Sequence, residues 1–309
     1  MALLAALLLV PRAVFAHPGA SLAPHDVWSA WTIAPAVLGG CALAVWFYVR
    51  GLRTLWARGG VGRVVSKRRA TCYAFAWLTL LVALVSPLDA MGAVLFSAHM
   101  VQHLLLMMVA APLFVLGDPL TASLWTFPIG ARRGVGAWWL RRTWLRAGWR
   151  TISSPGAAWL LHVVTLWLWH VPSLYDRALA DERVHVVEHL TFFATALLFW
   201  WALFAPHGRR LGSGAGVVYL FAAALQGTIL GALLTLARHP LYTAHFGTTR
   251  AWGLTPLEDQ QLAGLLMWVP ASAVYLAALV PLALRILREP RNQGVRALAV
   301  VGVSARGTP

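Results

Sequence analysis

The chain has 309 residues, of which 60% are hydrophobic and only 11% are charged, a composition that excludes an ordinary soluble domain. The net charge of +15 arises from 25 Lys and Arg against 10 Asp and Glu. These basic residues cluster in alternate loops, which indicates membrane topology in preference to nucleic-acid binding. Cys41 and Cys72 have no Cys-x-x-Cys spacing, so neither a disulfide framework nor a thiolate metal site is predicted.

The N-terminal segment predicts a signal peptide over residues 1–16. A short apolar core is followed by Ala13-Val14-Phe15-Ala16, a pattern that suits cleavage before His17. An uncleaved segment would be a short anchor instead. We expect residues 17–288 to form a membrane domain and residues 289–309 to form a cytoplasmic tail.

The membrane domain is predicted to be an all-α bundle of seven transmembrane helices, because seven apolar segments reach the roughly 20 residues that a span requires. These segments are 29–49, 70–88, 93–116, 154–172, 184–205, 214–237 and 262–284. Gly227 and Gly231 form a Gly-x-x-x-Gly pattern, which predicts a close helix contact in the sixth segment.

Charge fixes the expected orientation. The basic residues gather in the loop after the first segment, in the loop after the third and in the tail after the seventh: Arg50, Arg53, Arg58, Arg63, Lys67, Arg68, Arg69; Arg132, Arg133, Arg141, Arg142, Arg146, Arg150; Arg285, Arg288, Arg291, Arg296 and Arg306. The positive-inside rule therefore places the N-terminus outside and the C-terminus in the cytoplasm. The loop from Trp138 to Trp149 mixes arginines with tryptophans, which fits either a solvated basic loop or one that contacts membrane lipid.

Two histidine pairs stand out near the outer face. His99 and His103 open the third segment, and His185 and His189 open the fifth. Residues four apart lie on one face of a helix, and ionisable groups in a membrane helix usually face the protein interior. Both helices enter from outside, so the two pairs are expected to overlap in depth. His170 ends the fourth segment at the same face.

These side chains predict a metal site that contains His99, His103, His185, His189, Met107, Glu188 and His170. Imidazoles suit copper, zinc or iron, and the thioethers of Met91, Met100 and Met107 favour Cu(I). Glu188 is expected to ligate the ion, to orient an imidazole or to accept protons. The simpler alternative is that the histidines hydrogen-bond one another and that the methionines fill the core. Asp89 is expected to be a loop cap.

Two other functions fit parts of this pattern. His185-Val-Val-Glu188-His189 matches the His-x-x-Glu-His arrangement of inverzincin proteases, in which two histidines hold zinc and the glutamate is the base. This enzyme would also need a third ligand and an open coordination position. Alternatively, one histidine from each of two facing helices would hold a b-type haem, although haem needs only half of the four histidines.

Two sequence blocks are distinctive in combination. The first block comprises Ser86-Pro87-Leu88-Asp89, His99-Met100-Val101-Gln102-His103-Leu104-Leu105-Leu106 and Ala111-Pro112-Leu113. The second comprises Trp169-His170-Val171-Pro172-Ser173-Leu174-Tyr175-Asp176, His185-Val186-Val187-Glu188-His189-Leu190-Thr191-Phe192-Phe193 and Phe199-Trp200-Trp201. Together they resemble the CtaG family, the assembly factors of caa(3)-type cytochrome c oxidase.

The resemblance implies a multi-span protein of the bacterial inner (plasma) membrane that matures the oxidase by supplying copper to its catalytic subunit. It implies an assembly factor and not an enzyme. Cytochrome c oxidase subunits and a periplasmic or extracellular copper chaperone are the expected partners. The ligand role of His99, His103, His185 and His189 combines this resemblance with the helix geometry and is an expectation from both.

Overall fold

A computed structural model describes residues 22–32, 35–205 and 211–288 of the protein, and every regular element in these ranges is helical. The all-α class is therefore confirmed for the described residues. The predicted signal peptide and tail lie outside them. In chain order the elements are η1 (Pro24–Ser29), α2 (Pro35–Gly59), α3 (Lys67–Val85), α4 (Pro87–Gly92), α5 (Phe96–Leu104), the π-helix η2 (Leu105–Ala110), α6 (Ala111–Gly117), α7 (Pro119–Leu124), α8 (Ile129–Arg141), α9 (Thr143–Ile152), α10 (Pro155–Trp169), α11 (Pro172–Ala180), α12 (Glu182–Phe204), α13 (Ser213–Thr235), η3 (Thr249–Trp252) and α14 (Pro256–Arg288).

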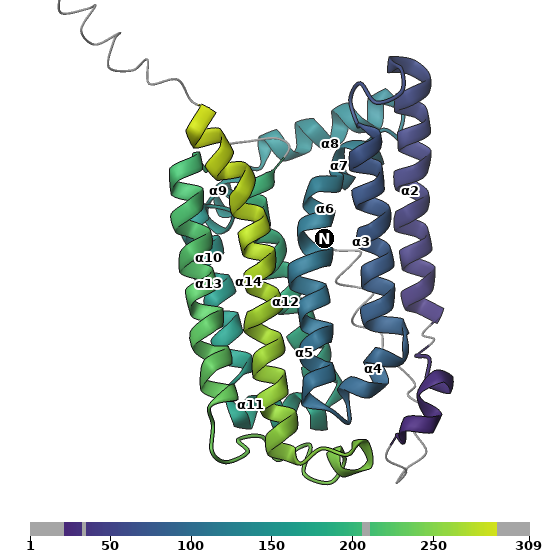
Figure 1. Ribbon diagram of the computed structural model, residues 1–309. Helices are drawn as coiled ribbons and strands as arrows, with labels where there is room; N and C mark the ends of the chain where they lie inside the picture. The colour runs from purple at the N-terminus through teal and green to yellow at the C-terminus, as the bar shows by residue number, and fades with distance from the viewer. Residues whose placement is uncertain (1–21, 33–34, 206–210, 289–309) are drawn as a thin grey trace, which may run out of the picture.

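The long helices run side by side along one direction (Figure 1). Helix α13 packs along α14, α5 contacts α14, and α6 contacts both α3 and α12. The continuous helix α5–η2–α6 thus occupies the middle of the bundle, with α2 and α3 on one side and α13 and α14 on the other. Its candidate span is 67% buried, a larger share than in α3, α12, α13 or α14.

Five helices are long and apolar enough to cross a membrane, or six if the bent pair α9–α10 forms one span. The five are Lys67–Val85, Phe96–Gly117, Glu182–Phe204, Ser213–Thr235 and Pro256–Arg288. The bend of 62° falls between Ile152 and Pro155. A total of seven spans remains a prediction. The first predicted segment, 29–49, begins too early, because Pro35 starts α2 and Ser29 belongs to a separate 3-10 helix.

The middle helix contains a π turn that follows from Pro112. Proline has no N–H and its ring crowds the preceding turn, so the regular pattern of bonds to the residue four earlier is interrupted. The Ala111 N–H reaches five residues back, to the Leu106 carbonyl. The next donor in this pattern would be Pro112, which leaves the Met107 carbonyl without a backbone partner. The indole N–H of Trp200 donates to that carbonyl at 2.8 Å.

The start of α5 is capped from a distant part of the chain. The carboxylate of Asp259 accepts hydrogen bonds from the Phe96 N–H at 2.7 Å, the Ser97 N–H at 3.1 Å and the Ser97 hydroxyl at 2.5 Å. Asp259 is fully buried in the first turn of α14. It therefore satisfies orphan donors of α5 and fixes α5 against α14.

The helix contact predicted at the Gly-x-x-x-Gly pattern forms at one of its two glycines. A Cβ on Gly231 would lie 2.9 Å from the Gly264 carbonyl oxygen, so α13 and α14 approach closely there. A Cβ on Gly227 would have no neighbour within 4 Å. The close contact is therefore between Gly231 on α13 and Gly264 on α14, and Gly227 takes no part in it.

The two ends of the bundle differ in charge. The end that carries the C-terminal turns of α2 and α14 together with α8 and α9 holds the basic clusters (Figure 1). Neither α8 nor α9 has a buried residue. The opposite end holds α4, α11 and the loop 236–255 (Figure 1). Both histidine pairs lie towards this opposite end, because α5 and α12 begin there.

Candidate metal centre

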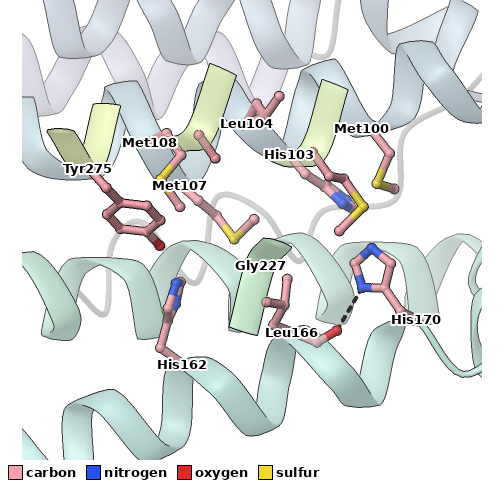
Figure 2. A pocket seen from close by; sticks show the side chains of 12 residues that line it. Met100, His103, Leu104, Met107, Met108, His162, Leu166, His170, Gly227 and Tyr275 are labelled. Carbon is pink, nitrogen blue, oxygen red and sulfur yellow. Dashed lines mark hydrogen bonds between the residues drawn. The ribbon is translucent and has the colours of Figure 1, made fainter. Parts of the chain in front are cut away.

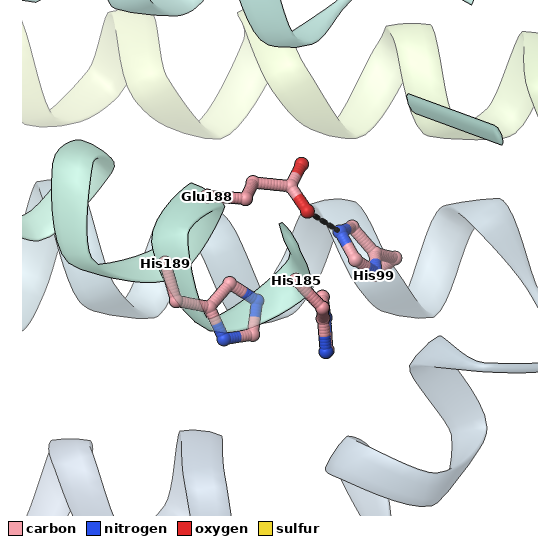
Figure 3. Close-up of side chains that lie close together, drawn as sticks. All are labelled: His99, His185, Glu188 and His189. Atoms are coloured by element: carbon pink, nitrogen blue, oxygen red, sulfur yellow. Dashed lines mark ion pairs between the residues drawn. The ribbon is translucent and has the colours of Figure 1, made fainter. Parts of the chain in front are cut away.

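Four side chains from two helices converge into one cluster, which we call the His-Glu cluster: His99, His185, Glu188 and His189. The three α12 residues share one helix face because they are spaced i, i+3 and i+4. His99 comes from the first turn of α5. One ligand atom of each residue lies within 4.8 Å of those of the other three. Glu188 points towards His99 in Figure 3.

The imidazole rings of the His-Glu cluster contact one another closely. The centroid of the His99 ring lies 5.3 Å from that of His185 and 5.7 Å from that of His189, and His185 and His189 are 4.2 Å apart. The exposed fractions are 0% for His99 and 1% for Glu188. Bulk water therefore does not solvate the two residues that link α5 to α12.

The polar atoms of these two residues are close without being hydrogen-bonded. His99 Nε2 lies 3.6 Å from a Glu188 oxygen, which exceeds the usual hydrogen-bond distance. His99 Nε2 and both carboxylate oxygens of Glu188 are buried without a hydrogen-bond partner. Two ligands of a tetrahedral ion, each about 2.1 Å from it, are separated by roughly 3.4 Å. The residues therefore fit a metal ion, since the distance of 3.6 Å between His99 and Glu188 is close to this separation between two ligands.

His103 adjoins this cluster from the next turn of α5. Its ring centroid is 4.3 Å from that of His99 and 5.1 Å from that of His189. Its Nε2 lies 3.8 Å from the second Glu188 oxygen, and neither of its ring nitrogens has a hydrogen-bond partner. His103 also lines a small cavity together with Met107 and His170 (Figure 2). The predicted ligand set thus divides between the His-Glu cluster and this cavity, with His103 at both.

The polar residues around α5 hold it in place and do not join the His-Glu cluster. Gln102, fully buried, donates from Nε2 to the Ala83 carbonyl and to Asp89 Oδ1, both at 2.8 Å. Asp89 lies in the first turn of α4. This bond joins α4 to α5 beside His103, so Asp89 acts across two helices and is not the loop cap that was expected.

An aromatic layer covers the end of the His-Glu cluster that faces the loop 236–255. The Tyr175 ring packs edge-on against His99 at 5.4 Å, and its hydroxyl is hydrogen-bonded to His245 Nε2 at 2.8 Å. Burial is the main reason that the pKa of Tyr175 is raised well above its usual value, and the Glu188 charge adds to it. Burial lowers the pKa of His245 to about 4. Both groups are therefore neutral at physiological pH.

The loop 236–255 is fastened over this aromatic layer. The Asp176 carboxylate accepts hydrogen bonds from the Thr243 N–H at 3.2 Å, the Thr243 hydroxyl at 2.7 Å and the Ala244 N–H at 3.2 Å. The Tyr242 hydroxyl donates to the His170 carbonyl at 3.0 Å. Sequence reasoning assigned no role to Tyr175 or Asp176, although both fall in the block that resembles the CtaG family.

The geometry gives little support to the two alternative functions. His99 would supply the third imidazole that a zinc hydrolase needs, but the neighbouring cavity of about 40 Å³ is far below the roughly 300 Å³ of a small-molecule site. For haem, the ring centroids of the cluster are at most 5.7 Å apart. Such contact between the rings leaves no plate-shaped space for a porphyrin between α5 and α12.

Comparison with known proteins gives a consistent likeness across most of the chain. A family model described as cytochrome c oxidase caa3 assembly factor (Caa3_CtaG) matches residues 46–289. The uncharacterized protein Mb0105 of Mycobacterium bovis is 30% identical over 271 residues, which cover 83% of this chain and 39% of that protein. The uncharacterized protein ML1998 of Mycobacterium leprae is 28% identical over 272 residues, which cover 84% of this chain and 39% of that protein.

The chain therefore spans about two fifths of the length of these curated relatives. No solved structure matches it. The matched family region contains both histidine pairs, Glu188, Met107 and His170.

Proposed function

This chain belongs to the family of cytochrome c oxidase caa3 assembly factors, and from that membership we propose that it binds copper and delivers it to a haem-copper oxidase. It acts as an assembly factor in the plasma membrane and not as an enzyme. Its partners are oxidase subunits and a copper chaperone at the outer face. The copper ion is cargo that the protein receives and releases.

The observation that carries this proposal is the buried His-Glu cluster. Four donor groups lie within 4.8 Å of one another, and the atoms of His99 and Glu188 that face each other are not hydrogen-bonded. Leaving such groups unpaired in the interior costs about 1–3 kcal/mol each, which a bound cation would offset. Imidazole and carboxylate donors suit copper or zinc, and the family description favours copper.

The distribution of arginines supports the orientation of the protein in the membrane. The histidines lie at the bundle end opposite the arginine clusters, and the positive-inside rule puts those arginines in the cytoplasm. The His-Glu cluster then lies near the outer face, on the side from which a donor or acceptor of copper outside the membrane approaches. Release proceeds by ligand exchange, as an incoming donor replaces one imidazole at a time.

The test compares the wild type with the triple variant His99→Ala, His185→Ala and His189→Ala. Copper per purified chain is expected to fall by about one equivalent, and cytochrome c oxidase activity in host membranes is expected to fall with it. His239→Ala is the matched control, because His239 is exposed in the loop 236–255. Unchanged copper and unchanged oxidase activity in a folded triple variant would refute the proposal.

A further inference from the structure

A cavity of about 40 Å³ lies between the middle helix and helices α10, α13 and α14 (Figure 2). Four of the six methionines of the chain line it. Its sulfur- and nitrogen-bearing residues include Met100, His103, Met107, Met108, His170 and Met267. All six are buried. Thioethers are weak, soft ligands, so their gathering around one small space with three imidazoles, those of His103, His162 and His170, distinguishes this cavity from ordinary core packing.

His170 is held in the state that a metal ligand requires. Its Nδ1 lies 2.7 Å from the Leu166 carbonyl oxygen, which only accepts, so Nδ1 carries the proton. Nε2 then carries a lone pair, and this nitrogen is buried without a hydrogen-bond partner. In Figure 2 the ring of His170 faces His103. A bond from one ring nitrogen to a backbone carbonyl is the usual way in which proteins orient a ligating imidazole.

The size of the cavity limits its occupant. A space of about 40 Å³ accommodates a single ion or one or two water molecules and excludes organic ligands. A Cβ on Gly227, which also borders the cavity, would have no neighbour within 4 Å. A side chain at Gly227 would therefore meet no steric obstacle at the wall of the cavity.

We propose that this cavity is a second metal site, specific for a soft monovalent cation of the Cu(I) or Ag(I) class and held by His103, Met107, Met100 and His170. The inference rests on the proposed copper function and deepens it. The His-Glu cluster carries a carboxylate, which Cu(I) shares with harder ions such as zinc, whereas every donor of the cavity is neutral. A single charge costs less to bury among neutral donors than a double charge does.

His103 connects the two sites. It lies 3.8 Å from Glu188 on one side and lines the methionine cavity on the other. A Cu(I) ion passes from the His-Glu cluster to the cavity by exchanging Glu188 and α12 imidazoles for thioethers while it keeps His103. The exchange involves no change in oxidation state.

The experiment titrates the detergent-purified full chain with Cu(I) under anaerobic, reducing conditions against a chromogenic Cu(I) chelator, and records the sulfur scattering of bound copper by X-ray absorption. Wild type is expected to bind about two equivalents with Cu–S scattering. The double variant Met100→Leu, Met107→Leu keeps the side-chain volume and is expected to lose one equivalent and most of the Cu–S scattering. Met91→Leu, which changes a methionine outside the cavity, is the matched control.

Two further variants separate this inference from the proposed function. His185→Ala with His189→Ala is expected to lose the other equivalent while keeping the Cu–S signal. Gly227→Val adds bulk at the wall of the cavity without removing a donor and is expected to lose the same equivalent as the methionine variant. The second site is refuted if the wild type binds one equivalent of Cu(I) without Cu–S scattering and the Met→Leu variant binds the same amount. That result leaves the function proposed for the His-Glu cluster intact. Normal oxidase activity in the His185/His189 variant, with the Cu–S equivalent retained, refutes the cluster function and supports the cavity.

Discussion

Replacing Asp259 tests whether the start of α5 depends on its distant cap. The carboxylate accepts from two buried backbone N–H groups, those of Phe96 and Ser97, and from the Ser97 hydroxyl. Asp259→Ala leaves both amides without an acceptor, at about 1–3 kcal/mol each. We therefore expect the free energy of unfolding to fall by roughly 2–6 kcal/mol.

Asp259→Asn separates hydrogen bonding from packing, because it preserves the side-chain volume. Its amide keeps one acceptor oxygen, so one backbone N–H remains paired, and the expected loss is roughly 1–3 kcal/mol. We expect stability to decrease from the wild type to the Asn variant and then to the Ala variant. Denaturant unfolding in detergent micelles measures this order. Glu258→Gln, which changes an exposed neighbour in the same turn, is the control with an unfolding midpoint close to wild type.

The same variants link the cap to the site. His99 lies two residues beyond Ser97, so loosening the first turn of α5 moves one of the four donors of the His-Glu cluster. Copper affinity is expected to decline in the same order as stability. If the Asn and Ala variants unfold at the same denaturant concentration as the wild type, the Asp259 cap does not stabilise the start of α5.

Three further changes probe the surroundings of the site. Trp200→Phe removes the donor to the Met107 carbonyl and is expected to cost about 1–3 kcal/mol of stability; unfolding at the wild-type midpoint would contradict this. Burial lowers the pKa of His245 to about 4 from about 6.5 in the unfolded chain, so the stability that it contributes above pH 6.5 is lost as pH falls towards 4. His245→Gln, followed by unfolding at several pH values, should flatten this slope, and an unchanged slope would exclude His245 as its source. Gly264→Ala places a Cβ against the backbone of α13 and should lower the melting temperature far more than Gly227→Ala; equal effects would refute the close contact.

Helices were predictable from the sequence because apolar content and proline position are local properties. The predicted segments 70–88, 184–205 and 214–237 differ from α3, α12 and α13 by three residues or fewer at each end. The π turn at Leu105–Ala110 was not predicted, because it depends on how Pro112 is accommodated against Trp200 of another helix. Hydropathy carries no information about such a contact.

The spatial grouping of the candidate site residues was predictable to the same extent, and metal binding by them stays a prediction. Spacing placed His185, Glu188 and His189 on one face of a helix, and topology brought His99 to the same end of the bundle. The cap at Asp259 acts across 163 positions of sequence, and no local pattern signals it. The division of the predicted ligands into a carboxylate-containing cluster and a thioether cavity likewise depends on the packing of α5 against α10, α13 and α14.

Helix α12 ties these two parts of the site together. Glu188 and His189 lie near its start, and Trp200, eleven residues further along, donates to the Met107 carbonyl. Eleven residues of α-helix span about 16 Å, so one rigid element contacts both the His-Glu cluster and the backbone that presents Met107 to the cavity. A shift of α12 that accommodates an ion at Glu188 must also act on the π turn. Trp200→Phe is accordingly expected to weaken copper binding at the thioether cavity more than at the His-Glu cluster. The substitution removes the hydrogen bond from α12 to the Met107 carbonyl and leaves Glu188 and His189 unchanged.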